Sequence, residues 1–387
     1  MSLDQDVCDY VNKTHANAWR ISTAGAPNEP AFVSSFLSKE MYRGLRHVLL
    51  SHASPGTKMM VRGIFTHQTP KVKLLTQSQA VEIADLMLVH QHFSYSRRHP
   101  TSGRALLFQA KKTPVQATGS VASGTQAYQF ELYRDWSPFV GTVRLAATPA
   151  INSNAPWDFL QGGTVSLATA TAGAEYLTVF DKQAYSINQA TPQWSASLQN
   201  GPAHADLIRE YTAACTWSAG VAPVPGSSAS NGVSCPDNFG IVLAEFLYAQ
   251  RGRSFTPGVL TGNDHWSIFV NTMLNISARP NGDYVYTCKN QGVIAGMRGR
   301  NLAFMQTLPA LWHSIEEELD CLLSNGPGYH EAFDVTNALI KRIFDLRTPF
   351  HKAPPPETQE APNVATPGHV PILIVTTIGN EFPFERG

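Results

Sequence analysis

The hydrophobic pattern changes its period twice between residues 28 and 136, and this change constrains the fold more than any other feature. A helical period runs over 32–49, after a helix-start signal at Asn28-Glu29-Pro30. Strand-like runs follow, and a second helical segment is predicted over about 126–136. The strand-like runs cover 59–65, 81–89 and 105–111. This order of helix, three strands and helix predicts a compact α/β core.

The rest of the chain is predicted to be mainly helical after an irregular stretch. Helical patterns cover 239–250, 266–276, 302–323 and 331–346, and the final ILIVTTIG run is predicted to add an edge strand. The predicted regions are an α/β domain over 1–140, an irregular Ala/Thr/Ser/Gly-rich region over 141–235, a mainly helical region over 236–350, and a Pro-rich tether with a terminal strand over 351–387.

Composition excludes several classes of protein. The five cysteines have no CxxC spacing, which argues against a zinc ribbon or a disulfide scaffold. The polar start MSLDQDVCDYVNKTH has no apolar signal region, and the most apolar stretch, 371–379, is too short to cross a bilayer. We therefore expect a soluble cytoplasmic protein that does not act at a membrane.

The net charge of zero conceals an uneven distribution. Between Phe36 and Val115 there are twelve Lys and Arg residues but only three acidic residues, and the remainder of the chain carries the opposite excess. A local basic excess of this size is typical of a site for a polyanion such as nucleic acid. The alternative is a solvated basic face that binds no ligand.

Polar residues interrupt the apolar pattern of the predicted strands. On a regular strand over 81–89, Asp85 would share one face with apolar residues, and Gln109 and Lys111 would share a face of the next strand. A divalent metal bound by Asp85 and the Ala110 carbonyl would make a buried carboxylate tolerable. Lys111 would then hold an attacking water or stabilise negative charge. Glu82 would point to the opposite face.

The first predicted helix offers a second carboxylate. Glu40 lies on or beside its apolar stripe, where a charge is costly without a partner. We therefore prefer Glu40 over Glu82 as the residue that completes the site with Asp85.

Taken in order, Glu40, Asp85, Gln109-Ala110-Lys111 and the Gln129–Tyr133 segment resemble the motifs of the PD-(D/E)xK nuclease superfamily. The resemblance covers about a third of the chain. It implies a restriction-endonuclease-like core of a helix, a three- or four-stranded mixed sheet and a second helix. The QxxxY pattern resembles the branch that includes RecB-like nucleases. The implied roles are catalysis by Glu40, Asp85, Gln109 and Lys111; binding of Mg²⁺ or Mn²⁺ by Asp85, Ala110, Glu40 and Gln109; and substrate contact by Gln129, Tyr133, Lys112 and Arg43. Gln129 and Tyr133 would position DNA phosphate or, alternatively, support the site.

One position departs from the usual pattern of that superfamily. Gln109 stands where an acid is usual, as in the QxK variant of Mrr-like nucleases, and its amide brings no negative charge to a metal. The resemblance predicts a metal-dependent nuclease acting on DNA rather than RNA, and by analogy a bacterial defence or restriction effector. The alternative is a catalytically inactive nuclease-like fold that binds nucleic acid or serves as an assembly subunit. A homo-oligomer or a partner defence subunit is left open.

Overall fold

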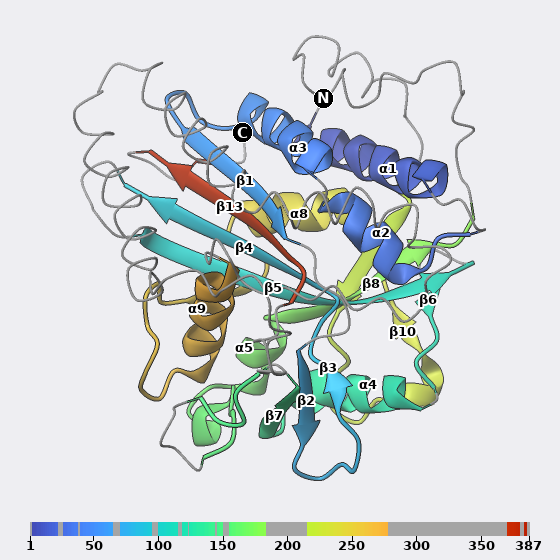
Figure 1. Ribbon diagram of the computed structural model, residues 1–387, viewed down its shortest axis with the longest axis vertical. Coiled ribbons are helices and arrows are strands. Elements are labelled where there is room, and N and C mark those ends of the chain that lie inside the picture. Colours follow the sequence, from blue (N-terminus) through green and yellow to red (C-terminus); the bar gives the residue numbers. More distant parts are fainter. Residues whose placement is uncertain are drawn as a thin grey trace, which may run out of the picture.

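The long strand β5 (Pro100–Thr113) lies in the middle of the main sheet (Figure 1). It pairs with one strand along one edge and with two successive strands along the other. The computed structural model describes residues 2–21, 26–37, 39–64, 70–94, 100–114, 118–122, 124–143, 145–149, 155–182, 215–277, 370–379 and 383–384.

Eight strands form the main sheet, in the order β1-β13-β4-β5-β8-β9-β11, and β12 pairs with β5 ahead of β8. β4 is antiparallel to β5, whereas β8 is parallel to β5 and β13 is parallel to β4, so the sheet is mixed. The bounds are β1 (Lys58–Ile64), β4 (Leu86–Phe93), β8 (Ala174–Phe180), β9 (Trp217–Val221), β11 (Asp237–Asn238), β12 (Arg253–Phe255) and β13 (Ile372–Ile378).

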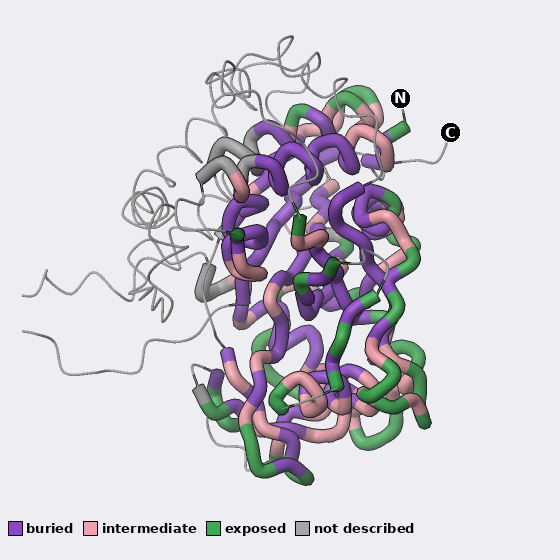
Figure 2. The backbone as a smooth tube through the Cα atoms, turned by 90° about the vertical axis from the view of Figure 1, so that its right-hand side faces the viewer, coloured by how far each residue is buried: buried purple, intermediate pink, exposed green. Residues whose placement is uncertain are grey.

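Helices cover both faces of this sheet (Figure 1). Alternate side chains of β5 enter different cores: Leu106 and Phe108 join one apolar cluster, and Ala105 and Leu107 join the other. Figure 2 shows buried residues running through the interior and exposed residues along the outer turns. The first cluster is closed by α1 (Leu3–Ile21), α2 (Glu29–Phe36), α3 (Lys39–Ser51) and α8 (Phe239–Leu247), and the second by α4 (Thr125–Asp135), α5 (Leu167–Thr171) and α9 (His265–Ser277).

Smaller elements complete the second face. A three-stranded sheet has the order β3-β2-β7, and a two-stranded sheet joins β10 to β6. The bounds are β2 (Lys71–Leu74), β3 (Val81–Glu82), β6 (Thr118–Gly119), β7 (Phe139–Val143) and β10 (Val233–Ser234), with short 3₁₀ turns η1 (Gln161–Gly163) and η2 (Ala229–Asn231).

The predicted mixed α/β class is confirmed, and several helices lie where periodicity predicted them. Asn28 caps α2 by accepting a hydrogen bond from the Ala31 N–H at 3.1 Å. The single helix predicted over 32–49 is two helices, because α2 ends at Phe36 and α3 begins at Lys39. The helix α1 was not predicted, and the segments 302–323 and 331–346 lie outside the described residues.

The C-terminal strand corrects the predicted organisation of the chain. The prediction of an edge strand is wrong, because β13 pairs with β1 on one side and β4 on the other, and all seven of its residues are buried. A continuous apolar run is typical of a strand covered on both faces. Because β8, β9, β11, β12 and β13 all belong to the main sheet, a domain boundary at residue 140 would cut through that sheet.

The described helices include none with the length and apolar character needed to cross a bilayer.

Strand β1 passes close to the break between α2 and α3. A Cβ added to Gly63 would lie 2.5 Å from the Leu37 carbonyl oxygen and 2.9 Å from its Cα, and both are backbone atoms. We predict that Gly63→Ala lowers the free energy of unfolding by about 1–3 kcal/mol, because strand and helix end must move apart. Urea denaturation measures the change, with Thr125→Ala, exposed at the start of α4, as the control. Equal stability of both variants would contradict this packing.

Candidate active site

A bend between β3 and β4 brings two carboxylates together. β3 ends at Glu82 and β4 begins at Leu86, so the regular strand predicted over 81–89 is wrong. The Asp85 N–H donates to the Phe108 carbonyl at 2.8 Å and ties the bend to β5. On a regular strand Glu82 and Asp85 would point to opposite faces. In the bend their side chains come close enough for each carboxyl group to shift the pKa of the other.

The Asp85 carboxylate lies along the edge of β5. The pairing of β4 with β5 stops at Leu86 opposite Phe108, so the β5 edge continues beyond the end of β4. The Ala110 N–H, on this continuing edge, donates to Asp85 Oδ2 at 2.8 Å, and the Gln109 side-chain amide donates to the same oxygen. Because β4 does not extend this far, the Asp85 carboxylate accepts the hydrogen bond that a backbone carbonyl of a neighbouring strand would otherwise accept.

A third carboxylate lies along the same edge. Glu29, in the first turn of α2, accepts a hydrogen bond from the Lys112 N–H at 2.7 Å. Lys112 and Ala110 are two residues apart, so the N–H groups held by Glu29 and Asp85 are roughly 7 Å apart along the strand. The N–H and C=O of one strand residue point to the same edge. The Ala110 carbonyl therefore faces the gap between the two carboxylates.

Lys111 and Gln109 share a face of β5, as their alternation predicts. Lys111 is only 5% exposed, and its ammonium donates to the Gln129 side-chain oxygen at 3.3 Å. Gln129 comes from α4, which covers this face of the sheet. An ammonium has three N–H donors, and Gln129 accepts from one of them. No other described residue accepts a hydrogen bond from Lys111, so two donors of its nearly buried ammonium remain for a ligand.

Tyr133 supports the bend. It is fully buried, its hydroxyl donates to the Ile83 carbonyl at 2.8 Å, and its ring stacks on Trp136 with centroids 5.4 Å apart. Of the two roles that the resemblance implies for Tyr133, contact with phosphate and support of the site, its fully buried position fits support of the site. Its hydrogen bond fixes the backbone between Glu82 and Asp85.

The electrostatics of the bend disfavour two ionised acids. Burial raises the pKa of Asp85 well above its ordinary value, and the adjacent Glu82 raises it further, while Lys111 opposes the rise. Burial also raises the pKa of Glu82, against the attraction of Lys71. Adjacent carboxylates with raised pKa values are typical of functional sites, because a bound cation relieves their repulsion.

Sequence reasoning missed Glu29 and discounted Glu82. Glu29 was read only as part of a helix start, where acids are common, so no pattern in the sequence distinguished it. Glu40 belongs to α3, which packs against β1, and the side chains of Glu40 and Arg43 lie outside the described residues. Lys112 is exposed, and its ammonium donates to the Pro27 carbonyl at 3.2 Å.

The donor set of the bend suits a hard divalent cation. Within the described residues no group of three or more His, Cys, Asp and Glu side chains is arranged as a metal cage. Mg²⁺ is usually held by one or two carboxylates together with water and substrate phosphate, so such a cage is not required. Glu82 and Asp85 supply two carboxylates. The Gln109 side-chain oxygen is buried without a hydrogen-bond partner in the described structure, and a cation beside Asp85 would satisfy it.

The raised pKa of Asp85 predicts a stability cost at neutral pH. In the unfolded chain the carboxyl ionises near pH 4, whereas in the folded protein ionisation is opposed. Wild-type stability should therefore fall relative to Asp85→Asn as the pH rises above about 4, by about 1.4 kcal/mol per unit of pKa elevation. Urea unfolding at pH 5 and pH 8 measures this difference. A larger advantage of the variant at pH 5 would contradict the direction of the shift.

Comparison with known proteins gives this site no counterpart. No family model, no curated protein and no solved structure matches the chain. The interpretation of the site therefore rests on its own geometry and chemistry.

Proposed function

We propose that the chain is a metal-dependent nuclease of the PD-(D/E)xK type that hydrolyses phosphodiester bonds in DNA. The observation that carries this proposal is that two carboxylates and a lysine lie close together where β5 continues beyond the end of β4. Asp85 and Glu82 supply the carboxylates, and Lys111 supplies the cation. One acid and one lysine from adjacent strands are the arrangement that the sequence motifs predict.

The arrangement of secondary structure supports the same proposal. The antiparallel pair β4–β5 carries Asp85 at its open end and the Gln-Ala-Lys segment on the second strand. The helix α4 follows with Gln129 and Tyr133, and β8 then pairs with β5 in parallel. This order of helix, sheet and helix supports the proposed restriction-endonuclease-like core, with additional strands from the remainder of the chain.

The residues of the site suit hydrolysis of a phosphodiester. Water adds to phosphorus while the bond to the leaving sugar oxygen breaks, and negative charge accumulates on the phosphoryl oxygens. A bound Mg²⁺ or Mn²⁺ would neutralise part of this charge and lower the pKa of a water. The two N–H donors of Lys111 that Gln129 leaves free suit the attacking water or a phosphoryl oxygen. Tyr133 and the Asp85 backbone hold the carboxylates in place.

Basic residues beside the site suit a nucleic-acid backbone. Lys71 and Lys73 lie on the partly exposed face of β2, and Lys71 is directly opposite Glu82 in the β2–β3 pair. Lys112 is exposed at the edge of β5. Lysine side chains on this rim would meet phosphates, and binding would weaken with salt. A role in bacterial defence or restriction stays a prediction.

We predict that the protein nicks or linearises plasmid DNA in Mg²⁺ or Mn²⁺ and that Asp85→Ala and Lys111→Ala reduce the rate at least about 100-fold. Asp4→Ala on α1 and Lys58→Ala on β1 are the matched controls and should retain activity. Retention of salt-dependent DNA binding without cleavage in either metal would favour the inactive, nucleic-acid-binding alternative. Absence of both cleavage and binding would favour a solvated basic face.

A second experiment identifies the carboxylates that accompany Asp85. Glu82→Gln and Glu29→Gln should each raise the Mn²⁺ concentration needed for half-maximal cleavage roughly 10- to 100-fold, because each removes negative charge beside Asp85. Glu40→Gln is the comparison, since Glu40 is the helix acid that the sequence motif proposes. A shift in Glu40→Gln alone would assign the role to Glu40 and contradict the assignment to Glu82 and Glu29.

A further inference from the structure

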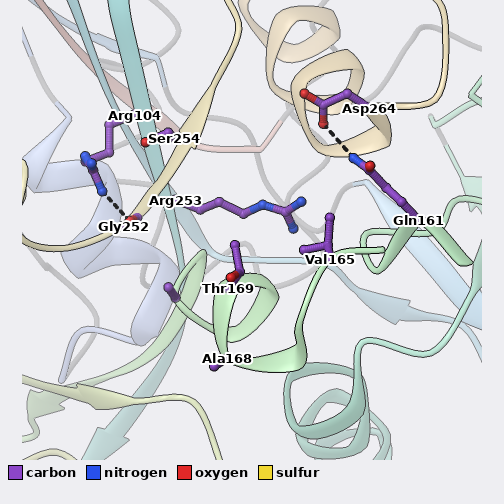
Figure 3. Close-up of a pocket in the computed structure, with 10 residues that line it drawn as sticks. Arg104, Gln161, Val165, Ala168, Thr169, Gly252, Arg253, Ser254 and Asp264 are labelled. Atoms are coloured by element: carbon purple, nitrogen blue, oxygen red, sulfur yellow. Dashed lines mark hydrogen bonds between the residues drawn. The ribbon is translucent and has the colours of Figure 1, made fainter. Parts of the chain in front are cut away.

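A cavity of about 600 Å³ lies beside Arg104 in the N-terminal half of β5 (Figure 3), and none of its lining residues belongs to the candidate active site. Its walls come from β5, the η1–α5 segment, β12 and the start of α9. The volume falls within the range of small-molecule sites, roughly 300–1,000 Å³. Three small apolar side chains form part of the wall: Val165, Ala168 and Ala172.

Arg253 places a nearly buried positive charge in this cavity. The residue is 6% exposed, its guanidinium lies 5.2 Å from the centre of the Trp266 ring, and one N–H group donates to the Phe159 carbonyl at 3.1 Å. Figure 3 shows the side chain extending across the cavity toward Val165. A guanidinium has five N–H donors, and among the described residues only the Phe159 carbonyl accepts from Arg253, so most of these donors remain for a ligand.

No carboxylate of the described residues forms an ion pair with Arg253. Asp264 also lines the cavity and attracts Arg253 at longer range. Its oxygens, however, accept from the Ser267 N–H, the Ser267 hydroxyl and the Gln161 amide. Burial lowers the pKa of Arg253 to about 10, which still leaves the group charged at neutral pH. A buried charge without a paired anion is costly, and a bound anion would offset that cost.

Other donors line the same cavity. Arg104 also lines the cavity, but its guanidinium donates to the Gly252 carbonyl at 2.6 Å and the Arg251 carbonyl at 3.3 Å and is directed away from that of Arg253 (Figure 3). Thr169 on α5 and Ser254 on β12 also line the cavity. With Asp264 counted, the charged lining carries a net positive charge. The planar guanidinium of Arg253, with several N–H donors, suits an oxyanion such as phosphate, whose several oxygens accept more hydrogen bonds than a single carboxylate does.

We propose that this cavity binds a small phosphate monoester of about nucleotide size, with its phosphate on Arg253. The apolar side chains of α5 and the preceding turn would contact the remainder of the ligand. The proposal does not depend on the nuclease assignment, because it involves different residues and a different part of β5.

Isothermal titration of the full chain with inorganic phosphate, AMP and acetate tests the proposal. We expect saturable binding of AMP, weaker binding of phosphate and none of acetate. Arg253→Gln should weaken AMP binding at least about tenfold. Ala168→Glu, on an exposed position of α5, should do the same by adding a negative charge to the wall, whereas Ala168→Gln, which has a similar size but no charge, should weaken AMP binding clearly less than Ala168→Glu does.

The Ala168 variants keep the test decisive if Arg253→Gln fails to fold, because Ala168 is exposed and makes no core contact. Absence of saturable binding of AMP and phosphate would overturn the proposal. AMP binding that is equal in Ala168→Glu and Ala168→Gln would also overturn it. A third outcome would also overturn the small-molecule proposal. The wild type would bind an oligonucleotide without a terminal phosphate but not AMP, and Ala168→Glu would lose the oligonucleotide. That result would identify a backbone phosphodiester as the ligand.

Discussion

The candidate site depends on an unequal length of two paired strands. β5 continues beyond the end of β4, and the backbone N–H groups of Ala110 and Lys112 on its continuing edge need acceptors. Asp85 and Glu29 supply those acceptors at 2.8 Å and 2.7 Å. The hydrogen bonds that satisfy this edge of β5 beyond the end of β4 therefore also hold two carboxylates next to each other. Lys111 lies between Ala110 and Lys112 in β5. Its ammonium donates a hydrogen bond to the side-chain oxygen of Gln129 on α4.

This arrangement stores electrostatic repulsion. Glu82 and Asp85 both have raised pKa values because burial and proximity oppose their ionisation. Natural sequences tolerate such costs mainly where function requires them. The rest of the core compensates: Tyr133 fixes the bend through Ile83, and its ring packs between Trp136 and Tyr176 at 5.4 Å and 5.6 Å. The packed aromatic residues around Tyr133 thus hold Glu82 and Asp85 together, although the repulsion between their carboxylates would push them apart.

The remote strands give the sheet its rigidity. β13, from the C-terminal end of the sequence, lies between β1 and β4 in the sheet. β8 pairs with the C-terminal half of β5. These pairings join residues far apart in the chain, so local patterns do not reveal them. The composition of β13 was readable as a strand, but its central position was not, because an apolar run alone does not name its neighbours. For the same reason, the sequence did not reveal that strands from both sides of residue 140 share one sheet.

The sequence by itself determined the mixed α/β class, the helices α4, α8 and α9, the capping of α2 by Asn28, and the shared face of Gln109 and Lys111. These follow from periodicity and capping, which act over a few residues. Only the tertiary structure decided that Glu82 lies beside Asp85 and that Glu29 lies on the same strand edge. The bend between β3 and β4 removes the alternation of side chains that would place Glu82 and Asp85 on opposite faces. The packing of α2 on β5 brings Glu29 to the same strand edge. Neither leaves a local pattern in the sequence, because both result from contacts between segments distant in the chain.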